Sequence, residues 1–197
     1  MVRITNVKVY DLKESVIACR NAFRTEQVEY TDEEFEKSLP RAIQLANTPS
    51  GSGHQNFLKG LRVSFDIKYP NYFSPELQRY NFVDIVSSSS KMHKLKNMDM
   101  DACFNEYVTE QSKQQMKELL AQYNKDKSYE SFMRLLSNCP QGIELFMRCS
   151  TNYLQLRTIY KQRLHHKLID DWGVGFCQDF IEKLPYFNEF ISGNYGK

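Results

Sequence analysis

The amino-acid sequence predicts one α+β domain over residues 1–197, in which a central β-sheet is flanked by helices and a helical lobe. Apolar and polar side chains alternate with a period of two at residues 61–69, which is typical of a strand with one buried face. Residues 32–46 instead follow a helical pattern behind a capping box formed by Thr31 and Glu34. A chain of 197 residues is long enough to bury a substantial core.

Two more strands are predicted, one on each side of the central one in sequence. Residues 2–10 alternate loosely, and residues 143–149 place apolar side chains at every second position. The remaining apolar periodicity predicts helices at 13–24, at 102–123 with a break near 111–113, after Ser128, from a cap at Thr151 or Asn152, and at 172–184. Within the helix at 32–46, Pro40 is expected to kink the helix or to end its first half.

A helix is also predicted directly after the central strand. Ser74 is a suitable N-cap, Pro75 fits the first helical position, and apolar residues then recur at helical spacing up to residue 86. This helix would lead into four consecutive serines, 87–90, followed by Lys91. Several short donors beside a cation are what a phosphate group needs, so this segment is a candidate phosphate site, with a solvated loop as the alternative.

The segment from residue 53 to residue 93 resembles the signature of the flavin-dependent thymidylate synthases. That signature is an Arg-His-Arg triplet followed, after a short spacer, by Ser, Gly, Arg and Tyr. Arg79 matches the first Arg, and the four later positions are occupied by Ser89, Ser90, Lys91 and Met92. The family's Arg is replaced by Lys91, which offers a point charge instead of a two-pronged donor.

The resemblance continues on both sides of this motif. Upstream, Gly53 and His54 lie where the family has a Gly-His pair. In the second signature, near the C-terminus, Asn152 matches an Asn at the start of a helix, and Arg163 matches an Arg that contacts the uracil ring. The alternative for Arg163 is one cation among several in a basic helix, and the alternative for Arg79 is a surface arginine or an ion pair with Glu76 or Asp84.

What the resemblance implies is a homotetramer with active sites between subunits, FAD as cofactor, and NADPH and methylenetetrahydrofolate as co-substrates for the methylation of dUMP. Arg163 is the implied catalytic residue. The implied nucleotide-binding residues are Arg79, Ser89, Ser90, Lys91 and Arg163. The implied cofactor-binding residues are His54, Asn56, Arg79, Tyr80, Asn81, Asn152, Thr158 and Lys167.

The chain departs from the family's pattern at positions that contact flavin. Tyr80 and Asn81 replace the last two residues of the triplet, while Ala22, Thr158 and Lys167 replace further polar partners. We therefore expect a divergent enzyme that holds FAD weakly or has lost it. The alternative is a nucleotide-binding relative without flavin or catalysis.

Composition limits the other possibilities. A net charge of +2 gives no bulk basic character, which argues against a nucleic-acid-binding function. The basic helix at residues 157–167, with Tyr153 and Tyr160, keeps binding of single-stranded RNA as a third hypothesis. The five cysteines include no CxxC pair, so neither a zinc site nor a disulfide framework is predicted, and a reducing, cytoplasmic compartment fits best. No apolar run is long enough to cross a membrane.

Overall fold

The computed structural model describes residues 1–193 and is built around a four-stranded antiparallel sheet. The strands are β1 (Arg3–Tyr10), β2 (Arg62–Pro70), β3 (Asp84–Ser88) and β4 (Glu144–Asn152), in the spatial order β1-β2-β4-β3. Helices accompany the sheet on the rest of the chain, so the predicted α+β class is confirmed. The three predicted strands correspond to β1, β2 and β4.

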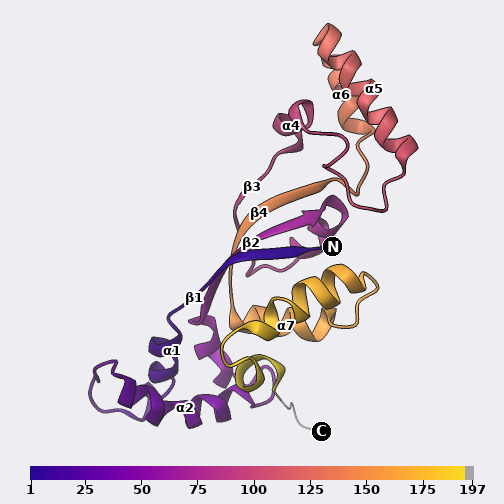
Figure 1. The fold of residues 1–197 in the computed structure, drawn as a ribbon. Coiled ribbons are helices and arrows are strands. Elements are labelled where there is room, and N and C mark those ends of the chain that lie inside the picture. The colour runs from indigo at the N-terminus through magenta and orange to yellow at the C-terminus, as the bar shows by residue number, and fades with distance from the viewer. Residues whose placement is uncertain (194–197) are drawn as a thin grey trace.

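Most of the helices lie at the two ends of the molecule or along one face of the sheet (Figure 1). The helices are α1 (Leu12–Ala18), α2 (Asp32–Ala46), α3 (Ser74–Leu77), α4 (Lys91–Lys94), α5 (Glu110–Asp126), α6 (Tyr129–Ser137) and α7 (Tyr153–Arg163). The first two lie at one end of the molecule, and α5 and α6 form a hairpin at the opposite end. No helix of the described residues is long and apolar enough to cross a membrane.

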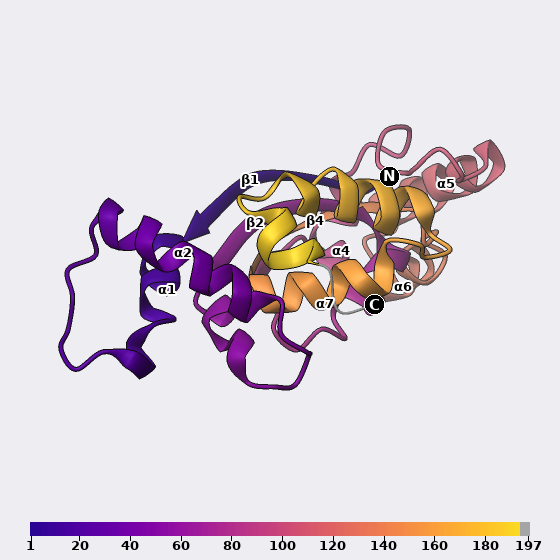
Figure 2. The same cartoon turned by 90° about the horizontal axis from the view of Figure 1, so that it is seen from below.

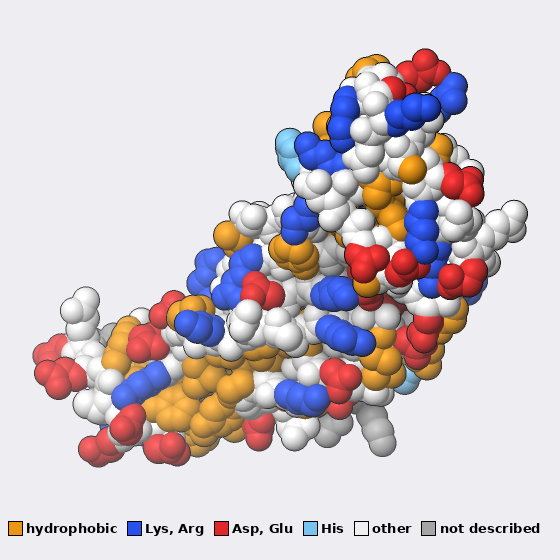
Figure 3. Space-filling model, turned by 45° about the horizontal axis from the view of Figure 1, so that its top comes forward, with side chains coloured by type: hydrophobic (Ala, Val, Ile, Leu, Met, Phe, Trp, Pro, Cys, Tyr) orange, Lys and Arg blue, Asp and Glu red, His pale blue; other side chains and the backbone are white. Residues whose placement is uncertain are grey.

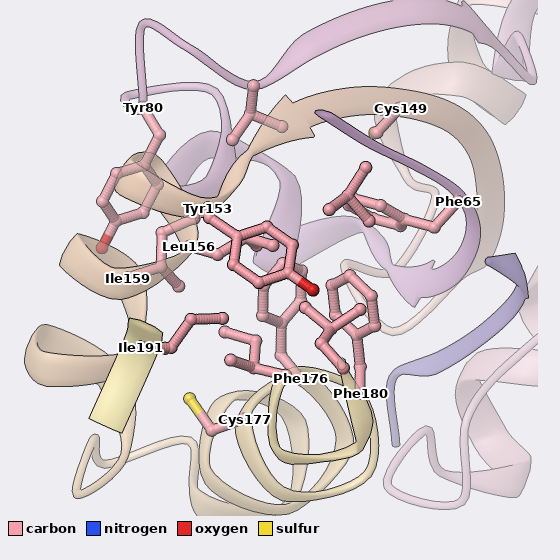
Figure 4. Packing of buried hydrophobic residues seen from close by; sticks show 14 of the residues in the cluster. Phe65, Tyr80, Cys149, Tyr153, Leu156, Ile159, Phe176, Cys177, Phe180 and Ile191 are labelled. Atoms are coloured by element: carbon pink, nitrogen blue, oxygen red, sulfur yellow. The ribbon is translucent and has the colours of Figure 1, made fainter. Parts of the chain in front are cut away.

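One face of the sheet carries the main core. Along β2 the alternating apolar residues are buried, and Phe65 lies opposite Cys149 of β4 in the register. Helix α7 and the π-helical segments Ile169–Gln178 and Phe187–Ser192 lie beneath this face (Figure 2). Their side chains point toward the strands and fill the space between the layers (Figure 4). The period-two pattern therefore identified the buried face correctly.

The helix caps predicted at Thr31, Ser128 and Asn152 are confirmed. The Thr31 hydroxyl accepts the backbone N–H of Glu34 at 3.1 Å, and the Ser128 hydroxyl accepts that of Ser131 at 3.1 Å. Asn152, rather than Thr151, caps α7. The helix that contains Pro40 continues to residue 46, because the loss of one backbone donor is outweighed by burial of its inner side.

The helix predicted from Ser74 to residue 86 is wrong beyond its first turn. Its predicted cap is also wrong, because Ser74 is the first residue of α3 and the N-cap position is occupied by Phe73. Helix α3 ends at Leu77, and Asp84–Ser88 forms the edge strand β3, paired antiparallel with β4. The apolar residues that suggested a helical stripe, Phe82, Ile85 and Val86, are largely exposed. Pairing with β4 satisfies the backbone of a segment too short and too β-branched to hold a helix by itself.

Other helix boundaries also differ from prediction. Residues 102–109, predicted to be helical, are irregular and contain a bridge between Phe104 and Ile143. Helix α5 begins after its N-cap, Thr109, and the break predicted at 111–113 is absent because these residues form its first turn. The helix predicted at 13–24 ends at Ala18, with a separate turn at Asn21–Phe23. The helix predicted at 172–184 begins earlier, with wide π-helical turns, and ends near residue 178.

A second, smaller apolar cluster supports the helical lobe. It joins α5 and α6 to the irregular segment before them and includes Leu95, Met100, Met116, Leu135 and Ile143. The lobe thus has its own packing and projects from the end of the sheet (Figure 1).

Candidate functional site

Arg163, the last residue of α7, is fixed in a network of aromatic and polar side chains. Its Nε donates to the Tyr80 hydroxyl at 2.7 Å, and its Nη1 lies 3.4 Å from Glu76 Oε2. The guanidinium carbon is 4.9 Å from the ring centre of Trp172, so it also forms a cation–π contact. With only 15% of the side chain exposed, the guanidinium has one favoured orientation. A fixed fork of this kind suits recognition of a planar carbonyl group.

Neighbouring groups complete this network. The Tyr80 hydroxyl donates to Gln162 Oε1 at 3.0 Å while accepting from Arg163. Glu76 Oε2 accepts the Trp172 indole N–H at 2.6 Å, and Glu76 Oε1 lies 3.5 Å from His166 Nε2. Tyr80 therefore helps to orient Arg163.

A hollow of about 380 Å³ lies beside this network and is named the arginine hollow. It is lined by Arg79, Tyr80, Asn81, Phe82, Gln155, Thr158, Gln162 and Arg163. The turn after α3 reaches α7 here, partly because the Thr151 hydroxyl donates to the Phe82 carbonyl at 2.7 Å. Five residues predicted from two distant motifs, Arg79, Tyr80, Asn81, Thr158 and Arg163, thus meet in one place.

The serines lie elsewhere, in a hollow of about 510 Å³ named the serine hollow. It is lined by Thr5, Asp66, Ile67, Lys68, Ser87–Ser90, His93, Lys94, Phe146, Met147 and Arg148. The Ser89 hydroxyl accepts the backbone N–H of Phe146 at 3.0 Å, so one predicted phosphate donor is engaged with β4. The serine hollow and the arginine hollow share no lining residue. Within one chain, Ser89 and Ser90 therefore line a different hollow from Arg163, and Lys91, the first residue of α4, lines neither hollow.

His54 and Asn56 line a third hollow, of about 610 Å³, named the histidine hollow. Its other lining residues are Ser15, Ala18, Cys19, Ala22, Phe23, Arg41, Leu45, Phe57 and Gly60. The Arg41 guanidinium carbon lies 5.3 Å from the ring centre of Phe23. Burial raises the pKa of the Cys19 thiol, although Arg41, Arg20 and Arg24 oppose the shift, so this cysteine is not an activated thiolate.

Two of the predicted cofactor-binding residues, Asn152 and Lys167, line none of these three hollows. The Asn152 side-chain oxygen accepts the backbone N–H of Gln155 at 2.9 Å, which makes it the N-cap of α7. Lys167 is exposed and lines none of the three hollows above.

Sequence reasoning missed Gln155 and Gln162, which complete the arginine hollow. Gln155, Thr158 and Gln162 are spaced by three and four positions, so they form one polar stripe on α7, and this spacing is visible in the sequence. Glu76 was considered only as a partner of Arg79, whereas it contacts Arg163 and Trp172. Nothing local in the sequence predicts that contact, because 96 positions separate Glu76 from Trp172.

No protein-family model and no curated protein matches this chain. Solved structures do match it. The flavin-dependent thymidylate synthase ThyX from Helicobacter pylori, complexed with FAD and dUMP, superimposes with a TM-score of 0.70 at 16% sequence identity. That alignment covers 100% of this chain and 99% of the other. A second structure of this enzyme with FAD and dUMP gives a TM-score of 0.67 at 15% identity, covering 97% of this chain and 96% of the other.

The resemblance seen in the two sequence motifs therefore extends to the whole described fold, including the sheet and the helical lobe. An agreement over the full length of both chains at so low an identity reports conserved architecture rather than conserved residues. This chain has the fold of the flavin-dependent thymidylate synthases.

Proposed function

We propose that this protein binds a pyrimidine nucleotide such as dUMP in the arginine hollow and is a divergent enzyme of the flavin-dependent thymidylate synthase type. The observation that carries the proposal is the fixed guanidinium of Arg163 beside Arg79 in that hollow. Nε and one N–H of Nη1 are engaged within the chain, and the other guanidinium N–H groups are the donors for a ring carbonyl. A cation at this position also stabilises negative charge that develops on the ring.

The phosphate of the nucleotide has its own donors under this proposal. Ser89, Ser90 and Lys91 supply them from a neighbouring subunit, because the two serines line a different hollow from Arg163 in the same chain and Lys91 does not line the arginine hollow. A homotetramer with shared sites satisfies this requirement. Hydrophobic side chains gather toward the end of the molecule that bears α1 and α2 (Figure 3), and Phe23 there is 74% exposed. Such a surface favours contact with another subunit.

The chain also offers positions for FAD. Arg79, Tyr80, Asn81 and Thr158 line the arginine hollow, and His54 and Asn56 line the histidine hollow, so six of the eight cofactor residues face a hollow. When bound, FAD would supply the hydride that reduces a transferred one-carbon group. Asn152 is engaged as a helix cap, and Ala22 offers no hydroxyl, so we expect FAD to be held more weakly than the nucleotide.

The test is to purify the protein, record its absorbance spectrum, and titrate dUMP and FAD separately by calorimetry. Nucleotide binding that outlasts flavin binding supports the proposal. Formation of dTMP from dUMP, methylenetetrahydrofolate and NADPH at added FAD distinguishes the enzyme from the alternative, a relative that binds nucleotide without catalysis. Absence of dUMP binding would reject both.

One observation favours the alternative function, a relative that binds a nucleotide without catalysis. Tyr80 places its hydroxyl between Arg163 and Gln162, in a position where the family has a charged or protonatable His. A tyrosine held by these two bonds orients the arginine but does not replace an imidazole in contact with flavin.

A further inference from the structure

Glu76, on the short helix α3, contacts Arg163 without lining the arginine hollow. Its Oε2 accepts the Trp172 indole N–H at 2.6 Å and lies 3.4 Å from Arg163 Nη1. Neither Glu76 nor Trp172 is among the described residues that line the hollow. Any influence of Glu76 on a ligand in the hollow therefore passes through Arg163.

The other oxygen of Glu76 is also engaged. His166 Nδ1 accepts the backbone N–H of Leu168 at 3.2 Å, so in the neutral ring the proton lies on Nε2. That nitrogen faces Glu76 Oε1 at 3.5 Å. The carboxylate therefore joins α3 to the end of α7, to the turn after α7 and to the π-helical segment that bears Trp172.

The buried indole of Trp172 requires an acceptor for its N–H, which by itself explains one oxygen of Glu76. It does not explain the position of Arg163. The guanidinium carbon lies 4.9 Å from the ring centre of Trp172 and 5.6 Å from that of Tyr80. The two rings meet edge to face with their centres 6.2 Å apart. Two aromatic rings and the oxygen that accepts the indole N–H thus fix the guanidinium together.

This arrangement determines which donors of Arg163 are left for a ligand. Nε donates to the Tyr80 hydroxyl, and Nη1 faces Glu76. Nη2 makes no hydrogen bond to any described residue, so its N–H groups are the donors that serve the hollow. A long side chain that is ordered before binding avoids the entropy loss of being ordered by the ligand.

We propose that Glu76 is a positioning residue for nucleotide binding, which fixes the Arg163 guanidinium through Oε2 and thereby leaves Nη2 for the ligand. This role rests on the proposed function for the identity of the ligand, a pyrimidine nucleotide. The fixed orientation of the guanidinium rests only on contacts within the chain.

Comparison of Glu76→Gln with Glu76→Ala separates the acceptor from the charge. Both variants lose the negative charge, but the glutamine amide oxygen replaces Oε2 as acceptor for Trp172 and Arg163. We expect calorimetry to give a dUMP dissociation constant about tenfold larger for Glu76→Ala than for Glu76→Gln. Glu130→Ala, which breaks an exposed ion pair with Arg134, is the control and should match the wild type. Equal dUMP affinities of the two folded Glu76 variants would overturn the assignment.

A role in positioning also requires that the effect disappears when Arg163 is absent. In an Arg163→Ala background, Glu76→Ala and Glu76→Gln should bind dUMP equally to within about twofold, because residues that act through one shared contact are not additive. A simple loss of stability would not produce this pattern. A tenfold difference that persists in the Arg163→Ala background would reject the positioning role.

The Nε–H of Arg163, observed by ¹⁵N NMR, tests the orientation without a ligand. Its exchange with water should be at least about tenfold faster in Glu76→Ala than in the wild type, and Glu76→Gln should restore the slow exchange. If Glu76→Ala does not fold, Glu76→Asp, whose carboxylate is set back by one methylene, should show the same faster exchange.

These measurements distinguish the failure of the positioning role from the failure of the proposed function. If the wild type does not bind dUMP but the exchange follows the expected pattern, the proposed function is rejected and Glu76 still positions Arg163. If dUMP binds and the exchange is equal in the wild type and all Glu76 variants, the proposed function stands and the positioning role is rejected.

Discussion

Substitution of Arg163 by alanine tests the centre of the candidate site. The change removes a guanidinium that is held by Tyr80, Glu76 and the face of Trp172 and is aimed at the arginine hollow. A lost pair of charge-assisted hydrogen bonds to a ring carbonyl should cost about 2 kcal/mol, or roughly thirtyfold in the dissociation constant of dUMP. Arg163→Lys should not restore the affinity, because an ammonium cannot reproduce the fork.

The same substitution also removes contacts within the chain, so binding and folding must be separated. The Tyr80 hydroxyl and Glu76 lose a donor, and we expect the free energy of unfolding in urea to fall by about 1–2 kcal/mol. Arg134→Ala is the matched control, since Arg134 makes an exposed ion pair with Glu130 on α6, far from the hollow in sequence and place. Equal dUMP affinities for the wild type and a folded Arg163→Ala protein, measured by calorimetry, would refute the role.

Three further predictions follow from other parts of the molecule. Light scattering at micromolar concentration should give the mass of a homotetramer, and a monomer would remove the basis for shared sites. Hydrogen bonds from Ser131 and Ser128 hold the pKa of Asp126 at about 2, below its ordinary value. The contribution of Asp126 to the stability of the start of α6 should therefore persist above about pH 4 and disappear as the pH falls toward 2. An NMR titration midpoint near 4 for this carboxyl group would contradict the prediction. Burial raises the pKa of Cys149 to about 12, so a thiol reagent at neutral pH should label Cys19 well before Cys149, as read by mass spectrometry.

The sequence by itself determined much of the local structure. Period-two alternation identified β2 and its buried face, because side chains of a strand point to opposite sides wherever its partners lie. The caps at Thr31, Ser128 and Asn152 were readable because a cap bond spans only three residues. The two motifs were sufficient to point to a fold that the solved structures share over the full chain.

Only the tertiary structure decided which elements meet. Residues 84–88 form a strand because β4 offers its edge, and this pairing joins segments about 60 positions apart that carry no local sign of each other. The same holds for the site. Arg163 and Tyr80 are 83 positions apart, and their contact depends on the turn after α3 packing against the end of α7. The sequence indicated which residue types to examine, whereas packing around Trp172 set the direction of the guanidinium.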